Sequence, residues 1–322
     1  MFEEQFQMDK RCRTLLERLW NHREDYGLRF ATLGSGAQIV DAGVEVRGSL
    51  EAGRLITELC QGGCCTTSLD LTDIGGIVLP RITVQSFFPT FSAYKLQAAR
   101  DVDGKMVSGP IRLCLETSER GEPNIMIEPV KACGIAVVQS DDLPSEAWVK
   151  SLASQSGLRP PDLTLVVAPI LSVAGATQIA GRVNENVIFS MEQSIGSDST
   201  RVKQLIGSSP VAPLGKDPND YNRPFPDDLL HYAGRAYLVL DAKPEEDVQK
   251  LADALCFQST SLYGKFFGTV LEEVNGVFMD IPGLLDINKI AQVTINDLNT
   301  GMLYHAGRQE YALLNELLTR RS

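Results

Sequence analysis

Apolar and polar positions follow two different periods along the chain, so both helices and strands are expected. Helical spacing with polar or glycine boundaries marks residues 10–26, 49–60, 145–155, 245–255, 263–273 and 311–319. Shorter apolar runs predict strands at residues 77–79, 82–87, 112–115, 134–138, 163–168 and 236–240. Two hairpins are predicted, at residues 28–41 around Gly34-Ser35-Gly36 and at residues 292–306 around Leu298-Asn299-Thr300-Gly301.

These elements intermingle without a strict strand–helix alternation. The pattern predicts an α/β to α+β protein in which mixed sheets are flanked by helices. A chain of 322 residues suffices for two domains. The Arg159-Pro160-Pro161 loop marks a boundary, so we expect domains at residues 1–160 and 161–322, with elements able to cross between them.

One helix-like segment, Leu171 to Phe189, carries the most informative side chains. Arg182 and Glu185 are three residues apart and are expected on one helical face. Gln178 joins that face, because positions 178, 182 and 185 follow the i, i+4, i+7 spacing. A carboxylate beside a guanidinium in an apolar stretch suits a general acid or base. Taken alone, the pattern fits an ordinary surface ion pair better, because such pairs are common and individually weak.

Composition narrows the function classes. The net charge is −11 and no basic run occurs, which argues against a nucleic-acid partner. No apolar run reaches the length of a membrane span, and the first residues lack a secretory signal. The seven cysteines are irregularly spaced, as expected for reduced thiols in a cytoplasmic protein. Cys60, Cys64 and Cys65 lack paired CxxC spacing, so we expect no metal site.

A series of short motifs is shared, in order, with one enzyme family. The motifs are Asp41-Ala-Gly, Gly48 to Gly53, Ser108-Gly-Pro-Ile-Arg112, Ala168-Pro169, Arg182-Val-Asn-Glu185, Gly207 to Pro213, Tyr263-Gly-Lys-Phe266 and Asn296 to Gly301. The region that these motifs mark covers roughly residues 28 to 307. On these motifs the chain resembles the methenyltetrahydromethanopterin cyclohydrolases, a family of one-carbon metabolism in methanogenesis and in formaldehyde oxidation.

The resemblance implies a reaction and a catalytic pair. Family members interconvert a 5,10-methenyl pterin and its N5-formyl form by addition of water. The acid–base glutamate and its arginine correspond to Glu185 and Arg182. A methenyl carbon is already electrophilic, so the expected chemistry needs neither a metal nor a redox cofactor. The family also implies a homo-oligomer, often a trimer, with the pocket in a cleft between two domains of each subunit.

Further substrate contacts are expected at seven positions: Gln178, Gly109, Pro110, Ser208, Ser209, Asp228 and Lys265. All of them except Asp228 also have a simpler interpretation that stays open. Gln178 fits a solvated helical face, Gly109 and Pro110 fit a tight turn, and the two serines fit turn chemistry. Asp228 matches a family aspartate at the end of a long Pro- and Gly-rich loop. Lys265, like Lys203, is expected near an anionic pterin tail or simply in solvent.

Two segments depart from the family pattern. Residues 84–100 lack its acidic-Pro motif, and residues 221–234 carry Phe225-Pro-Asp-Asp228 where the family usually has Arg-Thr-Asn-Asp. These departures leave an alternative to catalysis, a catalytically silent or re-purposed pterin-binding paralogue. A hydrolase with a Ser or Cys nucleophile has little support, because no nucleophile elbow is present.

Overall fold

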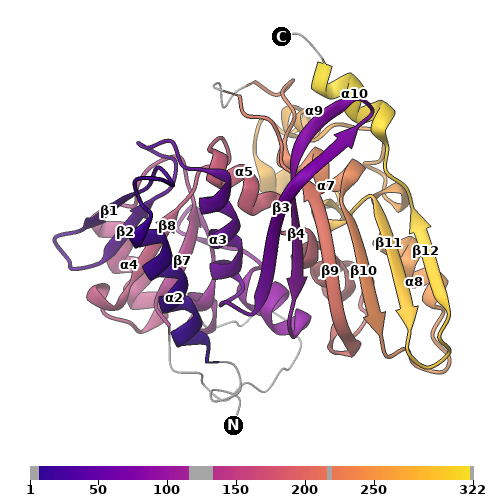
Figure 1. The fold of residues 1–322 in the computed structure, drawn as a ribbon, viewed down its shortest axis with the longest axis horizontal. Coiled ribbons are helices and arrows are strands. Elements are labelled where there is room, and N and C mark those ends of the chain that lie inside the picture. Colours follow the sequence, from indigo (N-terminus) through magenta and orange to yellow (C-terminus); the bar gives the residue numbers. More distant parts are fainter. Residues whose placement is uncertain (1–6, 116–132, 216–219, 320–322) are drawn as a thin grey trace. The chain divides into compact units, whose positions relative to one another are not determined.

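A computed structural model describes residues 7–115, 133–215 and 220–319. The chain divides into two compact units, Met1–Thr67 with Phe91–Gln178 and Ser68–Thr90 with Ile179–Ser322. Each unit is built on a six-stranded sheet flanked by helices (Figure 1). The expected α/β fold with mixed sheets is therefore confirmed. The predicted boundary at residue 160 lies within the second segment of the first unit, and residues 68–90 cross to the second unit.

The first unit contains a mixed sheet in the order β1-β2-β8-β7-β6-β5. Its strands are β1 (Arg29–Thr32), β2 (Gln38–Asp41), β5 (Arg100–Val102), β6 (Lys105–Ser108), β7 (Ile135–Gln139) and β8 (Thr164–Val167). Strands β2, β8 and β7 are parallel, and the outer pairs are antiparallel. Its helices are α2 (Met8–Asn21), α3 (Leu50–Cys60) and α4 (Glu146–Ser156).

Both faces of this sheet are buried. Val40 packs in a cluster with Leu55 of α3, whereas the adjacent Ile39 packs in a second cluster with Trp148 of α4. Successive strand residues point to opposite faces, so one strand can serve both clusters. This explains why the central strands appear in the sequence as continuous apolar runs.

The starts of two predicted helices are confirmed by side-chain caps. The Ser49 hydroxyl accepts a hydrogen bond from the Ala52 amide at 3.1 Å, and α3 begins at the next residue. The Ser145 hydroxyl does the same for the Trp148 amide at 3.2 Å at the start of α4. Serine is favoured at such positions because its oxygen satisfies an amide that the helix leaves unbonded.

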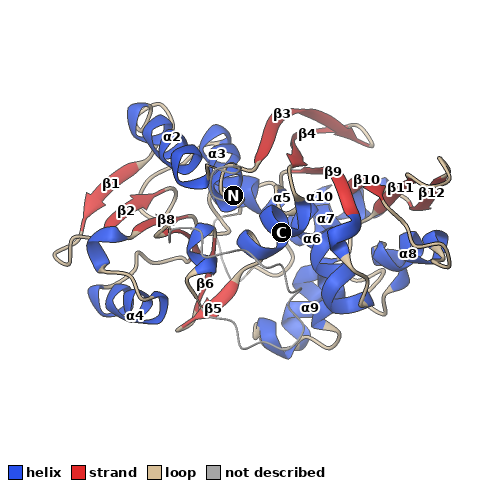
Figure 2. Ribbon diagram, turned by 90° about the horizontal axis from the view of Figure 1, so that it is seen from below, coloured by secondary structure: helices blue, strands red, loops and turns tan. Residues whose placement is uncertain are grey.

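The second unit contains a sheet in the order β12-β11-β10-β9-β4-β3. Its strands are β3 (Cys65–Ile74), β4 (Ile77–Ser86), β9 (Val202–Pro210), β10 (Arg235–Leu240), β11 (Gln292–Asp297) and β12 (Leu303–Gly307). Its helices are α6 (Val183–Phe189), α7 (Pro226–Ala233), α8 (Val248–Leu255), α9 (Phe267–Glu273) and α10 (Tyr311–Thr319). In Figure 2, helices α6 to α9 lie on one side of strands β9 to β12. Helix α5 (Val173–Ala180) spans the division between the units.

Several elements of the structure differ from the sequence predictions. The strand expected at residues 112–115 is wrong, because Pro110–Leu113 forms a 3₁₀ turn that starts at a proline. The strands expected at residues 77–79 and 82–87 form one strand, β4. Strands β3, β5, β6 and β9 were not predicted, and the residues of β3 are largely polar and partly exposed. The loop expected from Ser208 onward begins only after β9 ends at Pro210. The helix expected over residues 263–273 begins only at Phe267.

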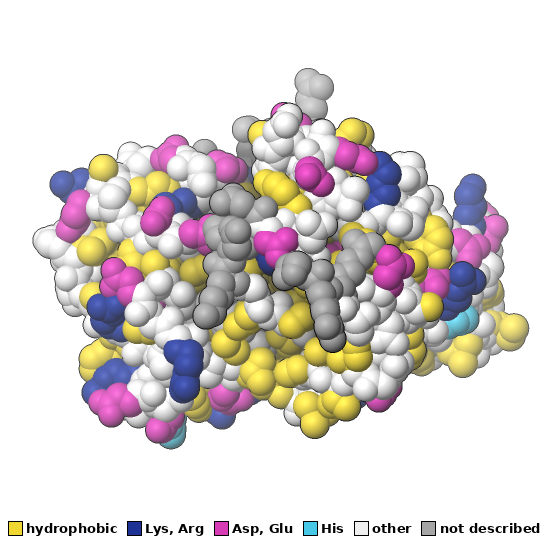
Figure 3. Space-filling view, turned by 90° about the horizontal axis from the view of Figure 1, so that it is seen from above, with side chains coloured by type: hydrophobic (Ala, Val, Ile, Leu, Met, Phe, Trp, Pro, Cys, Tyr) yellow, Lys and Arg dark blue, Asp and Glu magenta, His cyan; other side chains and the backbone are white. Residues whose placement is uncertain are grey.

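Two observations bear on membrane and nucleic-acid partners. No helix within the described residues is both long and apolar enough to cross a bilayer. Figure 3 shows one face of the molecule, on which Lys and Arg side chains are scattered among Asp and Glu side chains. This mixed pattern agrees with the net charge of −11.

Candidate active site

The segment with Arg182 and Glu185 is two short helices rather than one. Helix α5 ends at Ala180 and α6 begins at Val183, so the single helix predicted from Leu171 to Phe189 is wrong. Gly181 lies at the break, where a residue without a Cβ disfavours helix continuation. Arg182 is the cap of α6, with φ −84° and ψ 2°. The i, i+4, i+7 spacing therefore relates Arg182 to Glu185 within one turn but does not extend back to Gln178.

Arg182 and Glu185 form a buried pair. Their side chains are 10% and 7% exposed, and Arg182 Nη1 lies 3.3 Å from Glu185 Oε2. Charge-assisted hydrogen bonds are usually about 2.7–2.9 Å long, so this contact is a loose one. Because removing charges from water is costly, a buried pair of this kind needs a compensating role or partner. The interpretation as an ordinary surface ion pair is wrong, because neither side chain lies at the surface.

Asn184, which lies between Arg182 and Glu185 in the sequence, holds helix α6 against the second sheet. Asn184 is fully buried, and its Nδ2 donates to the Val84 carbonyl at 3.0 Å and to the Ser86 hydroxyl at 2.8 Å. On the adjacent strand, a Cβ added to Gly207 would lie 2.3 Å from Asn184 Oδ1. Only glycine lets the helix approach this closely. These contacts fix the backbone that carries the Arg182–Glu185 pair.

Asp227 is a further charged residue of this region. It lies in the first turn of α7 and is partly buried. Burial raises its pKa to about 6, Arg182 and Arg223 lower it, and Glu185 raises it. The Asp227 carboxylate is thus within electrostatic range of both members of the pair. No motif in the sequence pointed to Asp227, although it directly follows Pro226.

Asp228, a predicted substrate contact, is fully buried and makes two hydrogen bonds to the backbone. Its Oδ2 accepts from the Phe225 amide at 2.9 Å and its Oδ1 from the Phe267 amide at 2.7 Å. Burial raises its pKa to about 7, and these hydrogen bonds oppose that rise. Asp228 therefore joins the start of α7 to the start of α9. Its contact with substrate stays a prediction.

Ser208 and Ser209 follow each other in β9 and point to opposite faces of the sheet. The Ser208 hydroxyl accepts a hydrogen bond from Arg235 Nε at 3.1 Å. The Ser209 hydroxyl is fully buried and lies 3.2 Å from the Pro210 carbonyl. Gly207, which contacts α6, shares the face of Ser209. The two hydroxyls therefore cannot both point toward one bound molecule.

Lys265 belongs to an exposed salt bridge. Its Nζ lies 2.8 Å from Glu273, and its side chain is 44% exposed. The Lys265 carbonyl accepts a hydrogen bond from the buried Tyr232 hydroxyl at 2.6 Å. The backbone of Lys265 is therefore fixed, while its side chain reaches the surface. Lys203, the second lysine considered, lies 3.8 Å from Asp241 and is also half-exposed.

Three predicted contacts lie in the first unit. Gly109 has φ +96°, a conformation that favours glycine, and its amide donates to the Leu96 carbonyl at 2.7 Å. Pro110 is buried at the start of the 3₁₀ turn. Gln178 is fully buried, and its Nε2 has no hydrogen-bond partner among the described residues. A buried amide without a partner is costly, which favours a water molecule or a ligand at Gln178.

Comparison with known proteins gives the family. The family model described as "Cyclohydrolase (MCH)" matches residues 7–318. A methenyltetrahydromethanopterin cyclohydrolase of Methanococcus maripaludis strain C7 is 33% identical over 313 residues, which cover 94% of this chain and 95% of the relative. Proteins of the same name from Methanocaldococcus jannaschii and Methanothermobacter marburgensis are each 29% identical, and cover 97% and 92% of this chain and 98% and 94% of their own lengths. The chain belongs to the methenyltetrahydromethanopterin cyclohydrolase family.

Proposed function

We propose that this protein interconverts 5,10-methenyltetrahydromethanopterin, or a close analogue, and its N5-formyl form. The observation that carries the proposal is the buried pair of Arg182 and Glu185, 3.3 Å apart. The family membership and the substrate named for its relatives agree with it. The pair supplies the one thing the electrophilic methenyl carbon lacks, a positioned proton acceptor beside an attacking water.

The proposed steps balance with one carboxylate. Glu185 takes a proton from water as the water oxygen bonds to the methenyl carbon. The bond from that carbon to N10 then breaks as Glu185 gives its proton to N10. The hydroxyl of the adduct loses its remaining proton to solvent, so the N5-formyl product forms with the net release of one proton. In the ring-closing direction, protonated Glu185 delivers the proton that lets water leave. No electrons are transferred, so this chemistry requires no redox cofactor, and no metal is needed to activate the carbon.

Arg182 has a different proposed role from that of Glu185. A guanidinium close to a carboxylate favours its charged form, so Arg182 keeps Glu185 ready to accept a proton. Gln178, with its unsatisfied buried Nε2, is the predicted substrate contact with the best support.

We also propose a homo-oligomer, with a trimer as the expected state, which sedimentation would test.

The decisive experiment follows the ultraviolet absorbance of methenyltetrahydromethanopterin with the purified protein. We expect the absorbance to decay faster than in buffer, in proportion to protein concentration. Binding of the pterin is measured in parallel by fluorescence or calorimetry. Pterin that binds but never reacts above the spontaneous rate would replace the proposal with the silent pterin-binding paralogue. Absence of both binding and turnover would contradict the pterin as ligand.

A further inference from the structure

The second sheet has an open hollow on the face away from α6. Its volume is about 300 Å³, which is at the lower end of small-molecule sites. Its lining includes the polar side chains of Arg81, Thr83, Ser208, Arg235, Gln292 and Thr294, together with the larger side chains of Ile206 and Tyr237. No Asp or Glu belongs to the lining among the described residues.

The strand register explains how these side chains meet. Ser208 of β9 is opposite Thr83 of β4 on one side and Arg235 of β10 on the other. Arg235 is in turn opposite Gln292 of β11. Directly opposed residues point to the same face, so four strands contribute one continuous polar row. The Ser208 hydroxyl accepts a hydrogen bond from Arg235 Nε at 3.1 Å, which orients the guanidinium.

The two arginines of the hollow differ in their charge balance. Arg81 is held by Asp70, with a 2.9 Å contact between Arg81 Nε and Asp70 Oδ1. Arg235 is exposed and has no ion pair with any described carboxylate within 4.0 Å. Asp70, the partner of Arg81, is also within electrostatic range of Arg235, which lowers the pKa of that carboxyl. The two guanidiniums thus share one carboxylate, in a chain whose net charge is −11. Guanidinium groups match phosphate and carboxylate groups with paired hydrogen bonds.

The sheet separates this hollow from the catalytic pair. Gly207 contacts Asn184 and Val183 of α6, so its position in β9 identifies the face toward that helix. Ser208, the next residue of the strand, lines the hollow on the other face. A ligand in the hollow is therefore a sheet's thickness away from α6 and its Glu185.

We propose that this hollow is a second site, which binds a small molecule through a phosphate or carboxylate group. Arg235 supplies the charge and the paired donors, while the Ser208 and Thr83 hydroxyls and the Gln292 amide complete the polar row. The site is distinct from the pterin site of the proposed function. In this assignment the Ser208 hydroxyl serves the anion rather than the pterin.

The test measures binding of inorganic phosphate and of citrate to the full chain by isothermal titration calorimetry in a low-chloride buffer. We expect saturable binding of at least one of them, and the preferred one identifies the group that is recognised. Arg235→Gln should weaken that binding about tenfold, the usual effect of losing a charge-assisted hydrogen bond. Ser208→Ala should weaken it less, because the guanidinium remains.

Arg159→Gln is the matched control. It removes the same charge from a side chain that is 79% exposed and is not part of the hollow, so anion binding should persist.

Equal binding by wild type and Arg235→Gln would overturn the proposal. Displacement of phosphate by methenyltetrahydromethanopterin would overturn the separation from the pterin site. A change of oligomeric state in Arg235→Gln, without anion binding by the wild type, would assign the hollow to a contact between copies. Since binding is measured without turnover, its failure leaves the proposed cyclohydrolase activity untouched.

Discussion

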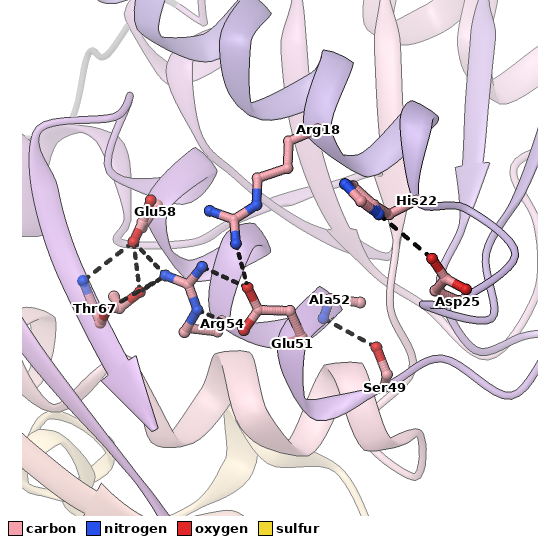
Figure 4. Close-up of polar contacts among 9 residues, drawn as sticks. All are labelled: Arg18, His22, Asp25, Ser49, Glu51, Ala52, Arg54, Glu58 and Thr67. Atoms are coloured by element: carbon pink, nitrogen blue, oxygen red, sulfur yellow. Dashed lines mark hydrogen bonds and ion pairs between the residues drawn. The ribbon is translucent and has the colours of Figure 1, made fainter. Parts of the chain in front are cut away.

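Two arginine–glutamate pairs with the same spacing show how context separates structure from chemistry. In the first unit, Arg54 binds Glu51 through two contacts of 2.7 Å and Glu58 through another of 2.7 Å (Figure 4). In the second unit, the Arg182–Glu185 contact is 3.3 Å long. The first arginine is held by short, paired hydrogen bonds, the geometry of a structural clamp. The second pair is looser.

The glutamates of the two pairs also differ in burial. Glu51 is 32% exposed and also accepts a hydrogen bond from Arg18 at 2.9 Å, so solvent and a second cation share its charge. Glu185 is 7% exposed and is near the charges of Arg182 and Asp227. The two arginines beside Glu51 favour its charged form, whereas the buried Glu185 is close to charges of both signs. The same spacing therefore predicts different roles.

The largest expected effect is on turnover. Glu185→Gln keeps the shape of the side chain and removes its ability to take a proton. We expect kcat to fall by about 10²–10⁴-fold, the usual effect of losing a general base, with pterin binding largely retained. Glu51→Gln is the matched control, and it should leave kcat within about twofold. A Glu185→Gln enzyme with near-normal kcat would place the base elsewhere.

Arg182→Ala is expected to have the next largest effect. Loss of the charged partner should lower kcat/KM about tenfold to a hundredfold. Without the guanidinium the carboxylate is easier to protonate, so its pKa rises and the acidic limb of the pH–rate profile moves to higher pH. Rates measured across the pH range would show the shift. A lower rate with an unmoved profile would instead make Arg182 a substrate-binding residue.

Asp228 should matter for stability. Asp228→Ala leaves the buried amides of Phe225 and Phe267 without their acceptor. Each buried unsatisfied group costs about 1–3 kcal/mol, so we expect a loss of about 2–4 kcal/mol in the free energy of unfolding. Urea unfolding measures it. Asp228→Asn keeps one amide oxygen and should lose less, and equal losses in both variants would contradict the double-acceptor role.

Asp227 should destabilise the fold in a pH-dependent way, so replacing it should raise stability, whereas replacing Asp228 lowers it. Its pKa is raised from about 4 in the unfolded chain to about 6 in the fold. The folded state therefore holds the proton more tightly, and stability falls as pH rises from about 4 to 6. Asp227→Asn removes this penalty, so its Tm should exceed that of the wild type more at pH 8 than at pH 5. Asp141→Asn, at an exposed position, should show no such difference.

Local sequence signals predicted much of the fold and part of the site. Helix starts at Ser49 and Ser145 and the hairpin around Gly34 follow from chemistry within a few residues, so they could be predicted. The break at Gly181 was missed, because apolar spacing continues smoothly through it. Asp227 was missed because its role depends on Arg182, which is 45 positions away in the sequence.

The smallest effect, on the free energy of unfolding, should come from breaking the Glu51–Arg54 pair. The Arg54 hydrogen bond, opposed by burial, lowers the pKa of Glu51. A carboxylate with a lowered folded pKa stabilises the fold above its unfolded pKa, and this contribution is lost as pH falls through the folded value. Glu51→Gln should cost about 1 kcal/mol at pH 7, since Glu58 still holds Arg54, and the difference should shrink toward pH 3. Urea unfolding at the two pH values tests this. A cost that does not change with pH would mean that packing, and not charge, makes the Glu51–Arg54 pair stabilising, and the contrast with Arg182–Glu185 would then lie in geometry alone.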